Sequence, residues 1–167
     1  MNQKIGIILG SDSDYPFMEK GIAILEKFNI PFEIEVSSAH RTPERTSEII
    51  KEFESTGIKI IIAAAGGAAH LPGVIAAQTL LPVLGVPVDS KLSGVDSLYS
   101  IIQMPGGIPV ATFGIGNSGG MNAVLFAMEI LSLTEQTIKE KLIQFREEQK
   151  RQVIEKSNRL KKRIKTE

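Results

Sequence analysis

Ile58-Lys59-Ile60-Ile61-Ile62-Ala63-Ala64-Ala65 is apolar at all but one position, so both faces of the element that it forms must be buried. Strands of parallel sheets, which helices cover on both sides, have this composition, whereas strands of antiparallel sheets usually alternate between apolar and polar residues. Gly57, directly before the run, is suited to end a preceding helix. We therefore predict that residues 58–65 form a central strand of a parallel sheet.

Strands and helices are predicted to alternate on both sides of this strand, because short apolar runs alternate with segments that have apolar residues at helical spacing. The other predicted strands span residues 4–9, 31–36, 82–88 and 108–113, and the predicted helices span residues 15–29, 43–56, 74–80, 93–103, 117–131 and 134–165. Parallel neighbours need crossover connections. We therefore expect an α/β fold, a three-layer flavodoxin-like parallel five-stranded sheet of order 2-1-3-4-5 with a long C-terminal helix.

The length of 167 residues predicts a single α/β domain, placed at 1–133, followed by a helical extension at 134–167. The absence of cysteine excludes disulfides and thiolate chemistry and is consistent with the cytoplasm. The first apolar run is too short for a signal peptide. Glycines and prolines interrupt the apolar region 58–88, so we expect no membrane span.

Charge is unevenly distributed along a chain whose formal net charge is zero. Residues 135–167 carry 11 Lys and Arg against 6 Glu, whereas residues 1–134 carry 8 Lys and Arg against 13 Asp and Glu. A basic segment can bind nucleic acid. Lys and Glu are interleaved at helical spacing here, however, and Phe145 is the one aromatic residue of the segment. This pattern favours a solvated helix, and no nucleic-acid partner is expected.

The predicted strand order brings three loops together at the carboxyl edge of the sheet. The first strand lies between the second and the third, so the loops at 10–14, 37–42 and 66–72 emerge side by side where such sheets bind ligands. Both histidines of the chain, His40 and His70, fall in these loops. We therefore predict a functional pocket at this edge.

The segment Ser37-Ser38-Ala39-His40-Arg41-Thr42-Pro43 concentrates groups suited to proton transfer on an anionic substrate. The imidazole of His40 can give or take a proton near neutral pH, and the planar guanidinium of Arg41 suits a phosphate or carboxylate. A helix that begins at Pro43 would add the free N–H groups of its first turn. The alternative is an ordinary capped helix start with a surface His and Arg.

Two other loops have compositions that suit parts of a ribonucleotide. Gly10-Ser11-Asp12-Ser13-Asp14 offers hydroxyl donors for a phosphate near Ser11, while Asp14 is suited to accept hydrogen bonds from sugar hydroxyls. Ala65-Gly66-Gly67-Ala68-Ala69 is so poor in side chains that its backbone can approach a flat ring closely. A capped turn and tight strand–helix packing are the respective alternatives.

Other kinds of site are disfavoured. Gly114-Ile115-Gly116-Asn117-Ser118-Gly119 matches a dinucleotide pattern, but no further strand with a ribose-binding acid is predicted after it. Two histidines and Asp14 give at most three metal ligands without a ligand-spacing motif, so no metal is expected. The G-x-S-x-G pattern of many serine hydrolases does not occur.

Four blocks of the sequence together carry a resemblance to a known family. They are Gly10-Ser11-Asp12-Ser13-Asp14, Ser38-Ala39-His40-Arg41-Thr42-Pro43, Ala65-Gly66-Gly67-Ala68-Ala69-His70-Leu71-Pro72-Gly73 and Gln103-Met104-Pro105-Gly106-Gly107-Ile108-Pro109-Val110-Ala111-Thr112. In this order they resemble the class I N5-carboxyaminoimidazole ribonucleotide mutases of bacterial purine biosynthesis. The resemblance implies a cytoplasmic isomerase that needs no cofactor. It also implies a homo-octamer with active sites near subunit boundaries.

The resemblance also implies a role for each residue at the matching positions. His40 is the implied general acid/base, in a reaction that decarboxylates the carbamate, retains CO2 and recarboxylates ring carbon C4. His70 joins it in the catalytic set and lines the CO2 pocket. The implied substrate-binding residues are Ser11 and Arg41 with Ser38 nearby for the phosphate, Asp14 for the ribose, and Gly66 and Gly67 for the ring.

Alternatives and departures accompany this resemblance. The animal-type carboxylases, which use free CO2, usually replace the H-R-T-P and A-H-L-P-G blocks that this chain retains. A flavin- or nucleotide-binding module without catalysis would suit the same fold. Met121 stands where many family members carry Lys, and Tyr15 stands where Trp is common. We further expect coupling to the ATP-dependent enzyme that makes the carbamate, and an arm on a neighbouring subunit from the first half of the last helix.

Overall fold

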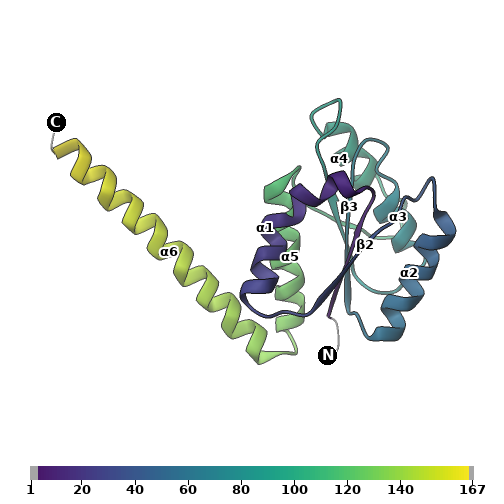
Figure 1. The fold of residues 1–167 in the computed structure, drawn as a ribbon, viewed down its shortest axis with the longest axis horizontal. Helices are drawn as coiled ribbons and strands as arrows, with labels where there is room; N and C mark the ends of the chain where they lie inside the picture. Colours follow the sequence, from purple (N-terminus) through teal and green to yellow (C-terminus); the bar gives the residue numbers. More distant parts are fainter. Residues whose placement is uncertain (1–3, 166–167) are drawn as a thin grey trace. The chain divides into compact units, whose positions relative to one another are not determined.

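Five parallel strands form one sheet in the order β2-β1-β3-β4-β5 in the computed structural model, which describes residues 4–165 (Figure 1). The strands are β1 (Ile5–Leu9), β2 (Phe32–Val36), β3 (Ile60–Ala65), β4 (Val83–Pro87) and β5 (Ala111–Thr112). Strand β1 pairs with β2 on one side and with β3 on the other. The predicted fold class and strand order are confirmed.

The centre of the sheet is buried on both faces. Every residue of β1, β3 and β4 is buried, whereas β2 at the edge is only half-buried and ends in exposed Val36. The isoleucines and alanines that predicted a central strand therefore lie in the core. Apolar burial of about 1.5–3 kcal/mol for each large side chain is what holds these strands at the centre.

Six α-helices occur within residues 4–165, of which the first four connect successive strands and, with the first part of the fifth, cover both faces of the sheet (Figure 1). They are α1 (Tyr15–Lys27), α2 (Pro43–Thr56), α3 (Leu71–Ala76), α4 (Val95–Ile102), α5 (Asn117–Ser132) and α6 (Gln136–Lys165), with a short 3-10 helix η1 (Asp12–Asp14) before α1. Helix α1 packs close to the first part of α5 at Gly21. Helices α2, α3 and α4 contribute to a core cluster on the other face. Gly57 ends α2 in a left-handed conformation, as predicted.

Most predicted boundaries lie within two residues of the observed ones, and two elements differ by more. The helix expected at 74–80 spans Leu71–Ala76, because Pro72 lies in its first turn, where a missing N–H costs nothing. The strand expected at 108–113 is reduced to two residues. Pro109 has no N–H to donate to β4, which agrees with pairing that begins only at Ala111.

Close backbone packing accounts for two of the glycines. A side chain at Gly6 of β1 would lie 2.3 Å from the ring of Phe53, so the missing side chain makes room for α2. A side chain at Gly119 would lie 1.6 Å from the carbonyl oxygen of Gly114. The Gly114–Gly119 pattern is therefore explained by a tight turn into α5.

The chain divides into two compact units, which meet in sequence between Ala127 and Met128. The second unit contains the end of α5 and α6, and in it Arg146 forms an ion pair with Glu129 at 2.6 Å. Side chains of residues 149–164 are exposed throughout. None of the helices within residues 4–165 is long and apolar enough to cross a membrane.

Candidate active site

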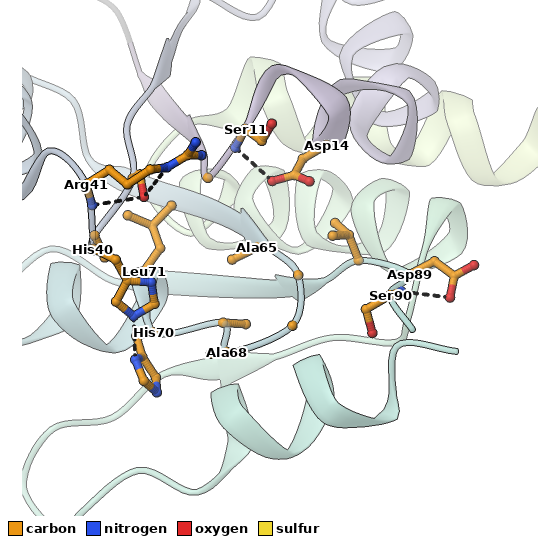
Figure 2. A pocket seen from close by; sticks show the side chains of 17 residues that line it. Ser11, Asp14, His40, Arg41, Ala65, Ala68, His70, Leu71, Asp89 and Ser90 are labelled. Carbon is orange, nitrogen blue, oxygen red and sulfur yellow. Dashed lines mark hydrogen bonds between the residues drawn. The ribbon is translucent and has the colours of Figure 1, made fainter. Parts of the chain in front are cut away.

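A cavity of about 470 Å³ lies at the carboxyl ends of four strands, and Figure 2 shows the side chains around it. We call it the carboxyl-edge pocket. Its lining comes from the loops after β1, β2, β3 and β4 and consists of Gly10, Ser11, Asp14, Ser38, Ala39, His40, Arg41, Ala65, Gly66, Gly67, Ala68, Ala69, His70, Leu71, Val88, Asp89 and Ser90. All eight site residues expected from the sequence thus line one cavity.

The turn after β2 is held by hydroxyl groups. Thr42 Oγ1 accepts a hydrogen bond from the Ser38 amide at 3.0 Å, and the Thr42 amide donates to the Ser38 carbonyl at 2.8 Å. Below them, the buried hydroxyls of Ser37 and Thr46 are 2.8 Å apart. This network fixes the backbone that presents His40 and Arg41.

Arg41 and Ser38 form a polar corner of the pocket. The Arg41 amide donates to Ser38 Oγ at 3.3 Å, and Arg41 Nε is 3.5 Å from the same oxygen (Figure 2). The guanidinium is exposed, so its remaining donors face solvent and the cavity. A guanidinium fork next to a hydroxyl is suited to a phosphate.

Ser11 and Asp14 bond to each other across the short helix η1. Asp14 Oδ2 accepts from the Ser11 amide at 3.0 Å, and Ser11 Oγ accepts from the Ser13 amide at 3.3 Å. Only 7% of Asp14 is exposed. Burial raises the pKa of its carboxyl above the ordinary value, while the backbone amides of Ser11 and Gly10 act in the opposite direction. A buried carboxylate with lone pairs facing a cavity is suited to bind hydroxyl groups.

His40 and His70 are in direct contact. His40 Nε2 lies 2.7 Å from His70 Nδ1, and the two rings meet edge to face with their centroids 4.8 Å apart. One ring comes from the loop after β2 and the other from the residue before α3, so residues thirty positions apart form one hydrogen-bonded pair. Such a pair can pass a proton between its members.

The loop after β3 presents backbone to the cavity. Gly67 has a φ of +64°, a conformation that favours glycine. A side chain at Gly66 would lie 2.8 Å from Val88 Cγ2. The buried hydroxyl of Ser97 accepts a hydrogen bond from the Gly67 amide at 2.8 Å. Gly66 is therefore required by tight packing against Val88, and Gly67 by its backbone conformation.

Sequence reasoning missed the fourth wall of the pocket. Asp89 and Ser90 follow β4 and line the cavity, and the Ser90 amide donates to Asp89 Oδ1 at 2.9 Å. The Ser90 hydroxyl also bonds to Asp96, and this hydrogen bond lowers the pKa of the Asp96 carboxyl. The same rule that selected the first three loops, position at the carboxyl end of a central strand, would have selected these residues.

The pocket combines an anion-binding corner, a buried carboxylate, a flat backbone surface and a histidine pair. Within residues 4–165, no three His, Cys, Asp or Glu side chains are grouped as metal ligands would be. This arrangement, at the edge of an α/β sheet, is suited to binding a small anionic ligand and to proton transfer.

A family model described as AIR carboxylase matches residues 4–152, and the chain therefore belongs to this family. It is 57% identical to the N5-carboxyaminoimidazole ribonucleotide mutase of Pyrococcus horikoshii over 93% of this chain and 88% of the relative. It is 52% identical to the enzyme of that name from Bacillus subtilis, over 96% of this chain and 99% of the relative. A crystal structure of Treponema denticola PurE superposes with a TM-score of 0.84 at 30% identity, covering 95% of this chain and 99% of that one. The resemblance drawn from the four sequence blocks is confirmed.

Proposed function

We propose that this chain is an isomerase that converts N5-carboxyaminoimidazole ribonucleotide to 4-carboxy-5-aminoimidazole ribonucleotide in de novo purine biosynthesis. The observation that carries the proposal is the contact of 2.7 Å between His40 and His70 in a pocket that also holds Arg41. The relatives from Pyrococcus horikoshii and Bacillus subtilis are named N5-carboxyaminoimidazole ribonucleotide mutases, which supports the same reaction.

The phosphate would bind at the corner formed by Ser11, Ser38 and Arg41. Their hydroxyls and guanidinium supply donors at one end of the pocket. Asp14, one turn away, would accept hydrogen bonds from the ribose hydroxyls. The aminoimidazole ring would then lie against the backbone of Gly66 and Gly67, where the absence of side chains leaves room for a flat ring.

The reaction then needs a proton donor and acceptor at the ring. Protonated His40 gives a proton to N5 as the bond from N5 to the carboxylate breaks, releasing CO2 and the aminoimidazole. Carbon C4, the nucleophilic carbon of this enamine, attacks the retained CO2, and His40 removes the proton from C4. The proton given equals the proton taken, so the enzyme returns to its starting state. A positioned acid/base contributes about 10²–10⁴-fold to such steps.

His70 would support this exchange from behind His40. Its Nδ1 contacts Nε2 of His40. When one ring gains or loses a proton, the hydrogen bond between the two nitrogens can therefore reverse its donor and acceptor. His70 also lines the cavity, where it would limit the space available to CO2.

A CO2-using aminoimidazole ribonucleotide carboxylase is the second candidate, because the family to which the chain belongs is that of the AIR carboxylases. We favour the mutase. In the test, purified protein receives N5-carboxyaminoimidazole ribonucleotide with ATP and bicarbonate withheld, and the C4-carboxylated isomer is measured. Conversion supports the mutase. An inert protein that carboxylates aminoimidazole ribonucleotide under high CO2 supports the carboxylase, and inertness in both assays leaves a flavin- or nucleotide-binding module.

Assembly and location belong to the same proposal. We propose a cytoplasmic homo-octamer in which residues 1–133 form the mutase domain and residues 134–167 extend it, with the first half of the extension on a neighbouring subunit. Functional coupling to the ATP-dependent enzyme that makes the carbamate would limit loss of this labile substrate. Light scattering of the purified chain tests the octamer, and a monomer at working concentrations would contradict it.

A further inference from the structure

Helix α4 holds the glycine loop of the pocket from the side away from the cavity. Ser97 Oγ accepts from the Gly67 amide at 2.8 Å, and Ser100 Oγ donates to the Gly67 carbonyl at 3.3 Å. Residues three apart lie on the same face of a helix. The two hydroxyls of α4 therefore fix the peptide groups on both sides of the Gly67 α-carbon.

Ser97 is fully buried, with none of its surface exposed. Within residues 4–165, the other buried polar side chains are Asp14, Ser37 and Thr46. Each of these belongs to the pocket or bonds beneath the turn that carries His40. Burying a hydroxyl is costly unless it is hydrogen-bonded. The buried polar groups are thus concentrated where the pocket loops need support, and Ser97 serves the loop after β3.

The orientation of Gly67 is transmitted to His70 through the backbone. The Ala69 amide donates to the Gly67 carbonyl at 2.8 Å, and the His70 amide donates to the Ala68 carbonyl at 2.7 Å. Gly67 lies at a bend of this loop with a φ of +64°, a conformation that other residues rarely adopt. A rotation at Gly67 would therefore move both the backbone facing the ring and the histidine that contacts His40.

We propose that Ser97 is a positioning residue, which sets the direction of the Gly66–Ala68 backbone against the aromatic ring of the bound ribonucleotide, with Ser100 in support. This inference rests on the proposed function. It assigns Ser97 no direct contact with the substrate. Its action is through the Gly67 peptide, which it holds at 2.8 Å.

The substitution Ser97→Ala tests this role because it leaves the Gly67 amide without its acceptor. We expect kcat to fall about tenfold or more, since misplacement by about 1 Å can cost about a hundredfold. Affinity for 4-carboxy-5-aminoimidazole ribonucleotide should fall as well. Affinity for ribose 5-phosphate should stay unchanged, because this probe has no ring and contacts the Ser11 and Arg41 end of the pocket.

Controls separate positioning from a general loss of stability. Ser97→Cys keeps a weak acceptor of similar size and should restore part of the kcat. Ser55→Ala removes a hydroxyl that bonds only within α2, at 2.8 Å from the Glu52 carbonyl, and should leave kcat and both affinities unchanged. If Ser97→Ala does not fold, Ser100→Ala can replace it, because Ser100 is only half-buried. It should lower kcat and ring-ligand affinity by smaller factors and leave ribose 5-phosphate affinity unchanged.

The inference is overturned if folded Ser97→Ala keeps the wild-type kcat and ring-ligand affinity. It is also overturned if the two ligands weaken equally, because that result indicates a general loss of the pocket. A wild-type protein without mutase activity defeats the proposed function instead. The comparison of the two ligands would then still test the positioning role by itself.

Discussion

His40 Nε2 and His70 Nδ1 lie 2.7 Å apart, although the two residues belong to loops that follow different strands. At this distance one nitrogen must carry a proton and the other must offer a lone pair. The contact therefore links the protonation states of the two rings. It also fixes which nitrogen of His40 remains available to a substrate, namely Nδ1.

The first prediction separates the two histidines. His40→Asn should lower kcat about 10²–10⁴-fold while ligand affinity is retained, because the group that transfers the proton is lost. His70→Asn should have a smaller effect, since His70 acts through His40. Mutase assays and binding of 4-carboxy-5-aminoimidazole ribonucleotide measure both. Equal losses in the two variants would contradict this division of roles.

The second prediction concerns the phosphate corner. Arg41→Gln should raise KM about 10- to 100-fold, which corresponds to the roughly 1.5–3 kcal/mol of a charged hydrogen bond, and should change kcat less. Arg45→Gln is the matched control in the first turns of α2, four residues further along the chain, because the Arg45 guanidinium already pairs with Glu35 at 2.6 Å. Similar increases in KM for both variants would argue against Arg41 as the principal phosphate ligand.

The third prediction concerns Asp14 and pH. Burial raises its pKa in the folded chain, so the stability that it contributes is present at low pH and is lost as the pH rises through the raised pKa. Asp14→Asn should therefore be more stable than wild type near neutral pH, and the difference should shrink as the medium becomes acidic. The variant should also bind the ribose more weakly.

Urea unfolding at about pH 4 and about pH 7 measures this difference. Asp12→Asn, an exposed neighbour in the same turn, serves as the control and should show no comparable gain. A neutral-pH stability of Asp14→Asn below that of wild type would show that the hydrogen bond to the Ser11 amide outweighs the cost of burial.

The fourth prediction compares adjacent glycines. Gly66→Ala would bring a methyl group to 2.8 Å from Val88 Cγ2, and we expect a loss of about 1–3 kcal/mol together with weaker ring binding. Gly67→Ala meets no atom within 4 Å but keeps a φ of +64°, and should cost about 1–2 kcal/mol through backbone strain. Thermal unfolding and KM distinguish the two. Unchanged KM in Gly66→Ala would contradict a ring at this loop.

The sequence was sufficient to predict a parallel sheet and its order, because apolar runs such as those at β1 and β3 alternate with helical segments and parallel neighbours need crossover connections. The sequence was less informative about the boundaries of elements in which a single proline determines where the element begins. Pro72 looked like a break and lies instead in the first turn of α3, and Pro109 shortens β5 in a way that local hydrophobicity does not reveal. Both errors arise from proline, whose effect depends on whether its missing N–H was needed.

Strand order was also sufficient to place the histidines at one edge, but not to predict their contact. The distance of 2.7 Å between them depends on the rotamers of both rings and on the turn held by Thr42. Residue spacing in the sequence predicts neither. Ser97 escaped prediction for another reason. It lies in the first turn of α4 and acts on a loop thirty residues away in sequence, so only the packing of α4 against that loop reveals its role.

Strand β5 joins the sheet through only two paired residues, Ala111 opposite Leu84 and Thr112 opposite Gly85. Amide deuterium exchange should therefore begin at this edge, whereas the amides of β1 and β3 should exchange only on global unfolding. The hydrogen bond between Ser97 and Gly67 does not involve β5. No residue of β5 lines the carboxyl-edge pocket, so early exchange at this edge would report on a part of the sheet that the ligand does not contact.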